Sequence, residues 1–258
     1  MKLYLHFLRF SFSKAMEFRV DFFFRIFMDL LFYAVNIAFF KILFLHTNLL
    51  AGWNESQAMV FVAGFLFVDA LNMTIFSNNL WWIPTLVNKG DLDYYLVRPV
   101  SSLFFLTLRE FAANSFLNLL MTVGILYWAI TSYTGVFTYW QVFAFILFLL
   151  VGTVTWAFLH LIFILPVFWT HSGRGLSNIF YSIGRVSEKP DRIFNGWARK
   201  IFTTVLPFSV INSFPARLIV EEFSWSVVFH IISVTTAVCI ILALLWRYSL
   251  RSYSSASS

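Results

Sequence analysis

The sequence predicts an all-α membrane protein with six transmembrane helices and both termini in the cytoplasm. Three observations lead to this fold class: 60% of the 258 residues are hydrophobic, only 12% are charged, and the mean hydropathy is +0.80. Soluble domains have about 25% charged residues, so this chain has too little polar surface to cover a globule in water. The composition therefore excludes an ordinary soluble enzyme, a disordered chain and a secreted disulfide scaffold. A single cysteine, Cys239, also excludes an internal disulfide.

Six apolar runs approach or exceed the length that a membrane span requires, which is about 20 residues. Helices are the expected form, because an open sheet would leave backbone groups unpaired in lipid. The predicted spans are residues 22–45, 57–77, 103–131, 139–169, 197–213 and 225–246.

The basic residues predict the orientation of the spans, because cytoplasmic loops carry an excess of lysine and arginine. The segment before the first span has four such residues, the loops 46–56 and 132–138 have none, and the segment 170–196 has four. We therefore expect both termini and the 170–196 segment to lie in the cytoplasm.

The first eighteen residues predict an amphipathic helix that lies in the inner membrane interface. Polar residues recur there at helical spacing, which leaves the apolar residues on the opposite face. Arg9 and Lys14 interrupt the apolar run that a signal peptide would need. A plain basic flank that sets the topology is the alternative interpretation.

The segment between the second and third spans contains clear signals for helix ends. Lys89 followed by Gly90 predicts a helix end, with the glycine in a left-handed conformation. Asp91 is placed to cap a new short helix, and Arg98 and Pro99 are placed to end it. Such a helix, with charged ends and an apolar middle, can dock on a soluble partner. A solvated turn with the same caps is the alternative.

The stretch Gly-Asp-Leu-Asp-Tyr-Tyr-Leu-Val-Arg-Pro at residues 90–99 resembles the signature of one group of ATP-binding-cassette (ABC) type-2 permeases, Gly-x-Leu-Asp-x-x-Leu-x-Arg-Pro. These permeases are the membrane halves of bacterial export-type ABC transporters. Weaker likenesses lie at residues 18–22, at 53–55 and at the paired prolines within 206–216.

The resemblance implies that residues 1–258 form a single permease domain, with two permease subunits in each transporter. The second subunit is either another copy of this chain or a related permease. It also implies an ABC ATPase subunit that docks on the cytoplasmic loop. The residues expected to contact the ATPase subunit are Gly90, Asp91, Leu92, Asp93, Arg98 and Pro99.

The sequence has no motif for catalysis or for nucleotide binding. It lacks the Gly-x-x-x-x-Gly-Lys-Ser/Thr loop that cradles phosphates, so ATP hydrolysis is expected on a partner and not on this chain. Its five histidines do not have the spacing of metal ligands. Its basic residues follow the topology and do not form one face. We therefore expect no cofactor, no bound metal and no nucleic acid.

Ionisable residues within membrane spans are energetically costly and are functional candidates by default. Asp69 lies midway along the second predicted span, and Asn72 follows close to one helical turn later. The pair is placed either to hydrogen-bond at a subunit interface or to line a translocation path.

Pro207 and Pro215 bracket residues 208–214, where a helix is expected to break. Broken helices at membrane depth occur where protein or a cavity covers them. The resemblance suggests a short re-entrant element at the outer face before the last span, which would form an outer gate. An ordinary tight outer turn is the alternative.

The leading hypothesis is therefore a permease subunit in a bacterial inner membrane that exports a substrate by ATP-driven alternating access. An ion-coupled secondary carrier is one alternative, although such carriers show internal repeats. The two halves of this sequence show no repeat. A membrane assembly protein that transports nothing is the other alternative.

Overall fold

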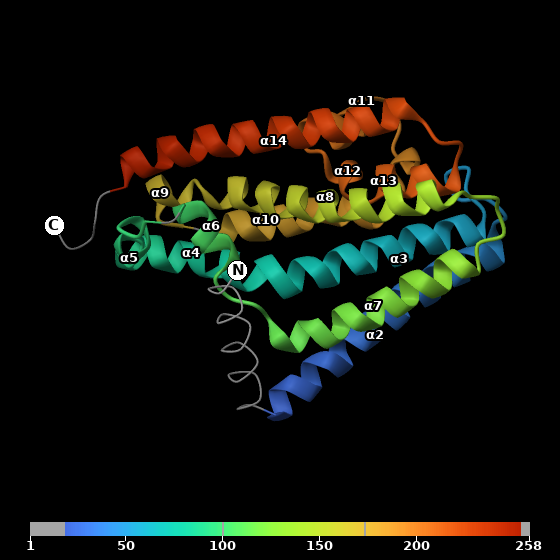
Figure 1. Cartoon of the computed structure of the whole chain (residues 1–258), viewed down its shortest axis with the longest axis horizontal. Helices are drawn as coiled ribbons and strands as arrows, with labels where there is room; N and C mark the ends of the chain where they lie inside the picture. Colours follow the sequence, from blue (N-terminus) through green and yellow to red (C-terminus); the bar gives the residue numbers. More distant parts are fainter. Residues whose placement is uncertain (1–18, 100, 173, 254–258) are drawn as a thin grey trace.

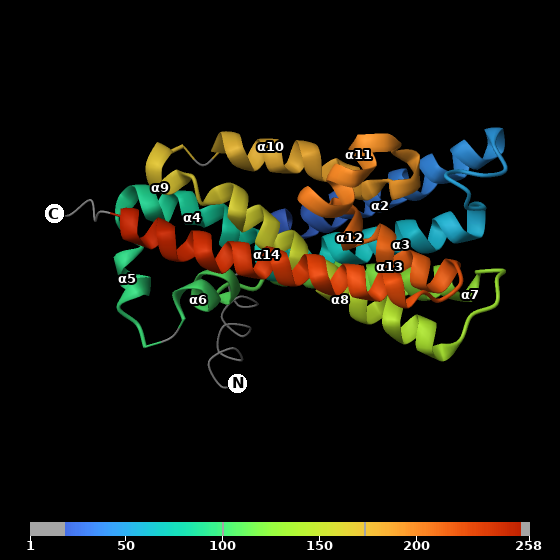
Figure 2. The ribbon, with the colours of Figure 1, turned by 90° about the horizontal axis from the view of Figure 1, so that it is seen from above.

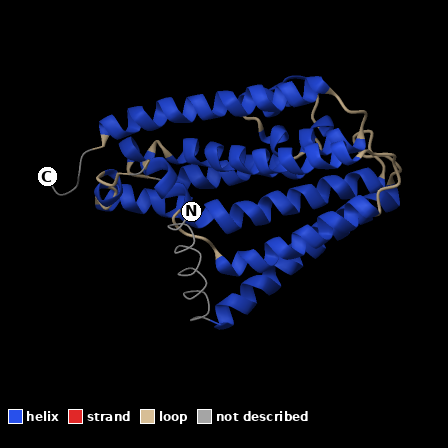
Figure 3. Cartoon of the chain, viewed as in Figure 1, coloured by secondary structure: helices blue, strands red, loops and turns tan. Residues whose placement is uncertain are grey.

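The computed structural model describes residues 19–99, 101–172 and 174–253, and within these ranges the chain is helical (Figures 1 and 3). The amphipathic helix predicted for residues 1–18 lies outside the described residues. The longer helices are α2 (Arg19–His46), α3 (Glu55–Asn72), α4 (Asn78–Lys89), α7 (Ala113–Thr131), α8 (Tyr139–Ile164), α10 (Arg174–Gly184) and α14 (Trp225–Ser252). The shorter ones are η1 (Met73–Ser77), α5 (Asp93–Leu96), α6 (Ser102–Leu108), α9 (Val167–Thr170), η2 (Arg185–Glu188), η3 (Asp191–Ile193), α11 (Gly196–Lys200), η4 (Ile201–Val205), α12 (Phe208–Ile211) and α13 (Ser213–Val220).

The long helices run in roughly the same direction, so their connections gather at two opposite ends of the molecule (Figure 1). One end holds α5, α9 and the last turns of α14, and we call it the α5 end. The opposite end holds the loops 47–54, 132–138 and 221–224, and we call it the Trp53 end. A hydrogen bond joins two of these loops, since the Trp53 indole nitrogen donates to the Glu221 carboxylate at 2.8 Å.

Four helical stretches are long and apolar enough to cross a membrane, and they correspond to the first, second, fourth and sixth predicted spans. The second stretch is longer than predicted, because the π-helix η1 joins α3 to α4 without ending the helix. The four stretches are Phe22–His46, Glu55–Lys89, Tyr139–Thr170 and Trp225–Ser252.

The third predicted span, 103–131, is interrupted between α6 and α7. The Asn79 side chain bonds to both backbone groups of Glu110, donating to its carbonyl at 2.7 Å and accepting from its N–H at 2.9 Å. The Ala112 N–H bonds to the Thr74 carbonyl at 2.9 Å. Groups on α4 and η1 therefore satisfy backbone atoms that a continuous helix would have paired internally.

The fifth predicted span, 197–213, is wrong as a continuous helix. The chain forms α11, η4 and α12 there, each of five residues or fewer. The segment 170–196, predicted to stay in the cytoplasm, instead runs along the bundle from the α5 end (Figure 2). Its α10 packs on α8, and its Arg192 pairs with Glu221 at the Trp53 end. The sequence alone does not predict this pair, because Arg192 and Glu221 are 29 residues apart in the chain.

The centre of the molecule is α3, which packs against α7 and α8. Every residue from Ala58 to Val68 is buried. By contrast, α2 and α14 lie at the edge of the bundle and display large apolar side chains, as expected where a helix faces lipid. Examples are Phe23, Phe24 and Phe27 on α2 and Phe229, Ile240 and Leu244 on α14.

Candidate functional site

The turn at residues 90–99 lies at the α5 end, between α4 and α6 (Figure 1). Gly90 ends α4 with a φ of 78°, and its N–H bonds to the Val87 carbonyl at 3.3 Å. A residue with a Cβ is strained by about 1–2 kcal/mol in this left-handed conformation. The predicted glycine cap is therefore confirmed.

Asp91 does not cap the short helix α5, so that prediction is wrong. The helix begins after Leu92, and no side chain among the described residues caps it. Its first N–H groups bond to backbone carbonyls, as Asp93 does to Gly90 at 3.3 Å. The Asp91 and Asp93 side chains therefore stay at the partly exposed surface of the turn.

Leu92, expected to contact a partner, is completely buried in the chain's own core, in the same apolar cluster as Leu106 and Trp246. It therefore anchors the turn to the bundle. The apolar side chains that the turn does display are Tyr94, 70% exposed, and Val97, 81% exposed. These two residues, and not Leu92, give the turn an apolar surface.

Arg98 fixes the far side of the turn. Its Nε donates to the Tyr94 carbonyl at 3.2 Å, and its guanidinium lies over the Phe105 ring at 5.0 Å. Pro99 follows and is exposed. The Ser101 hydroxyl then caps α6 by accepting the Phe104 N–H at 3.5 Å. The turn thus has a defined shape with an exposed charged and apolar surface.

The end of α14 closes this side of the bundle. Tyr253 lies edge-on to Phe168, with ring centroids 5.9 Å apart. Burial raises the pKa of the Tyr253 hydroxyl, and the nearby carboxylates of Asp93 and Asp91 add to this effect. The hydroxyl is therefore neutral at pH 7, as suits a side chain packed between helices.

Asp69 and Asn72 lie inside the bundle, where they line a cavity of about 10 Å³. The Asn72 amide donates to the Ser77 hydroxyl at 3.1 Å, while its oxygen has no hydrogen-bond partner in the described part of the chain. A cavity of this size holds about one water molecule. The other lining residues are Phe65, Val68, Trp156, Ser187 and Ile211.

Both prolines belong to a broken, wholly buried region, which consists of α12 and α13. Pro207 precedes α12, and Pro215 lies in the first turn of α13, where a missing N–H costs no helical bond. The Asn212 amide donates to the Phe61 carbonyl on α3 at 3.0 Å. Gly152 on α8 allows close approach, since a Cβ there would overlap the Ile211 carbonyl.

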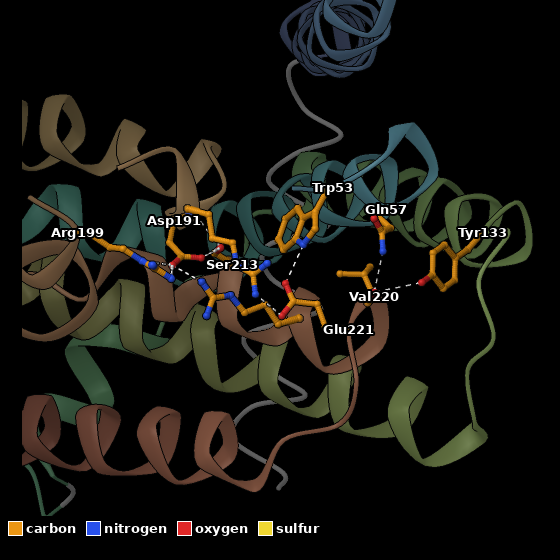
Figure 4. Close-up of polar contacts among 10 residues, drawn as sticks. Trp53, Gln57, Tyr133, Asp191, Arg199, Ser213, Val220 and Glu221 are labelled. Atoms are coloured by element: carbon orange, nitrogen blue, oxygen red, sulfur yellow. Dashed lines mark hydrogen bonds and ion pairs between the residues drawn. The ribbon is translucent and has the colours of Figure 1, made fainter. Parts of the chain in front are cut away.

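Asp191 is the buried charge that holds this element in place (Figure 4). Its carboxylate accepts hydrogen bonds from the Ser213 hydroxyl at 2.7 Å, from Arg199 at 3.1 Å, and from Arg217. Its own N–H donates to the Ser213 hydroxyl at 3.0 Å. One carboxylate thus joins η3, α11 and α13.

Glu221 forms a second polar centre at the Trp53 end (Figure 4). Besides the Trp53 indole, it pairs with Arg192 at 2.6 Å. The preceding Val220 carbonyl accepts the Gln57 amide at 2.8 Å, which ties the end of α13 to α3. The broken element is therefore fixed by polar contacts at its middle and at its C-terminal end.

Residues 30–257 match the sequence model of a family described as ABC-2 family transporter protein. The match covers the turn, the Asp69 cavity and the broken element. The chain belongs to the ABC-2 transporter family. It is thus a membrane protein of the ABC-2 permease type, as the sequence predicted. No curated protein and no solved structure matches the chain.

ABC-2 permeases are transporter components that are generally not catalytic themselves and that work with an ABC ATPase. Among the described residues, this permease has no group of three or more His, Cys, Asp or Glu side chains that could hold a metal ion.

The sequence analysis did not single out Asp191 or Glu221 as site residues. Asp191 stands in a basic segment that the sequence predicts to lie in the cytoplasm, and such a segment gives no reason to expect a buried carboxylate. One feature of the sequence does indicate that this segment packs on the core: its apolar residues recur at helical spacing, at Leu176, Phe180 and Ile183. That spacing is typical of a helix packed on a core and not of a solvated loop.

Proposed function

We propose that this chain is the membrane-spanning permease subunit of an ABC exporter in a bacterial inner membrane, and that a separate subunit hydrolyses ATP. The family match over residues 30–257 carries this proposal. The sequence has no phosphate-binding motif, which supports the proposal that ATP is hydrolysed on a separate subunit. The transporter contains two permeases, either two copies of this chain or this chain and a related one.

In this proposal the α5 end faces the cytoplasm. The basic N-terminal segment and the lack of lysine and arginine in the loops 47–54 and 132–138 support this orientation. Three arginines lie toward the opposite end, but each is paired with a carboxylate. These are Arg192 with Glu221, and Arg199 and Arg217 with Asp191.

The turn at 90–99 is the proposed ATPase contact. Its exposed surface comprises Tyr94, Val97, Arg98 and Pro99, beside the partly exposed Asp91 and Asp93. Closure of the ATPase pair on ATP presses on this surface. Because Leu92 is buried in the core, the turn transmits that push directly to α4 and α6.

The broken element α12–α13 is the proposed outer gate. Pro207 separates it from η4, and Pro215 lies in the first turn of α13. The element extends from the middle of α8, where Ile211 lies against Gly152, to the end of α13 at the Trp53 end. Polar contacts attach α13 to its neighbours and can be exchanged. Asp69 and Asn72 supply hydrogen-bonding groups between the two ends, either to the path or to a subunit interface.

The docking role of the turn is tested by purifying the tagged chain from its native membrane in mild detergent and identifying the bound subunits by mass spectrometry. We expect an ABC ATPase with the unmodified chain and its loss with the double variant Asp91→Lys and Asp93→Lys. Glu55→Lys reverses an exposed charge at the other end and is the matched control.

Retention of the ATPase by the double variant would remove the turn as the contact while leaving the permease assignment. Loss of the ATPase from the Glu55→Lys control as well would show that the effect is not local to the turn. Complete absence of an ATPase from the unmodified chain would overturn the proposed function itself.

A further inference from the structure

A groove separate from the turn and the Asp69 cavity opens at the α5 end, between α4 on one side and His171, Ser172 and Ser177 on the other. Its volume is about 690 Å³, large enough for a lipid headgroup and the start of an acyl chain. The residues that line it are Trp81, Trp82, Pro84, Thr85, Asn88, Lys89, His171, Ser172 and Ser177.

One part of the groove is aromatic. The Trp81 ring stacks on Tyr181, with centroids 5.7 Å apart and planes 11° apart, so its position is fixed by packing. Trp82 is 51% exposed beside it. Indole rings favour the membrane–water interface, where they contact acyl chains with their faces and headgroups with their N–H. This part of the groove therefore suits the glycerol end of a lipid.

The other part is polar and positively charged. Lys89 ends α4, is exposed, and has no ion pair among the described residues. The Asn88 amide donates to the His171 carbonyl at 2.9 Å, which joins the two walls. Thr85 and Ser172 add hydroxyl groups. The nearest acidic residues in sequence are on the turn and do not line the groove.

We propose that this groove binds one phospholipid with an anionic headgroup, with the phosphate at Lys89 and the first part of the acyl chains against Trp81 and Trp82. Charge complementarity selects the occupant, since an unpaired ammonium next to hydroxyl and amide donors matches a phosphate. With the orientation proposed above, the lipid comes from the inner leaflet. Binding itself does not depend on the ATPase or on transport.

The test is native mass spectrometry of the purified chain in detergent, titrated with phosphatidylglycerol or with phosphatidylcholine of the same acyl chains. We expect one phosphatidylglycerol to bind preferentially, and Lys89→Gln to weaken that binding about fivefold, which is the effect of one basic residue near a membrane surface. Lys41→Gln is the matched control, because Lys41 also lies beside a tryptophan, 5.7 Å from the Trp128 ring, but toward the other end.

Each alternative result has a defined meaning. Equal binding of the two lipids, or equal weakening by Lys89→Gln and Lys41→Gln, would overturn the proposal. Glycerol phosphate is the third titrant and has no acyl chains; if it bound as tightly as phosphatidylglycerol, the groove would be a site for free phosphate and not for lipid. Because no nucleotide or partner is present, these outcomes leave the proposed permease function untouched.

Discussion

Asp191 shows how a charge can be buried in this permease. Removing a carboxylate from water costs several kcal/mol, and the cost is offset only where partners surround it. Asp191 has two arginines and a serine hydroxyl as partners, drawn from α11 and α13. A charge with such partners connects the short helices α11 and α13 to the residues around η3.

We expect Asp191→Asn to destabilise the protein by about 3 kcal/mol or more, because it leaves Arg217 buried beside a neutral amide. The readout is the midpoint of thermal unfolding in detergent. Glu222→Gln removes an exposed carboxylate nearby and should leave the midpoint unchanged. Equal midpoints for Asp191→Asn and the unmodified chain would mean that the carboxylate does not hold the element.

Among the elements, α12 depends on close packing as well as on charge. Its Ile211 carbonyl lies against Gly152 in the middle of α8. Glycine at this position allows a backbone-to-backbone contact that any larger residue would prevent. A second glycine, Gly64 on α3, also allows close approach, because a Cβ there would lie 2.7 Å from the Asn212 side-chain oxygen.

Gly152→Ala should therefore push α12 away from α8 and destabilise the chain by about 1–3 kcal/mol, the usual range for overpacking. The matched control is Gly124→Ala on α7, where no described atom lies within 4 Å of an added Cβ. That change should be neutral or stabilising by up to about 1 kcal/mol. Unfolding midpoints of the two variants test the contrast, and a neutral Gly152→Ala would contradict the packing described.

The elements that could be predicted from sequence are those whose signals are local. Four spans are uninterrupted apolar runs, and the helix end at Gly90 needs only a glycine after a basic last turn. The break at Glu110 could not be predicted, because the Asn79 amide that stabilises it is 31 residues away. The break in the predicted fifth span, 197–213, has a local signal, since it falls at Pro207. The burial of Asp191 has no such signal, because its partner Arg217 is 26 residues away.

In the candidate site, too, some features have local signals in the sequence and others depend on distant residues. The shape of the 90–99 turn follows from its own residues, whereas the burial of Leu92 depends on Leu106 and Trp246, which the sequence does not place beside it. The exposure of Tyr94 and Val97 on the turn could therefore be found only from the structure.

At the scale of the whole molecule, the proposed ATPase contact lies at one end of the helical bundle, and the proposed gate runs from its middle toward the other end (Figure 1). The central helix α3 reaches from the Trp53 end toward the α5 end and touches both α13 and α7. A displacement of the turn can therefore reach the broken element through packed helices. This arrangement is what the coupling of ATP hydrolysis to transport requires of a permease.

The most direct test of the central claim is the mass of the intact complex, extracted from its native membrane and measured by native mass spectrometry. We expect the tagged chain in a particle that contains two permease subunits and an ABC ATPase. Gentle dissociation should release the ATPase as a separate polypeptide. A particle that contains this chain without any ATPase, under conditions that preserve known transporter complexes, would contradict the account.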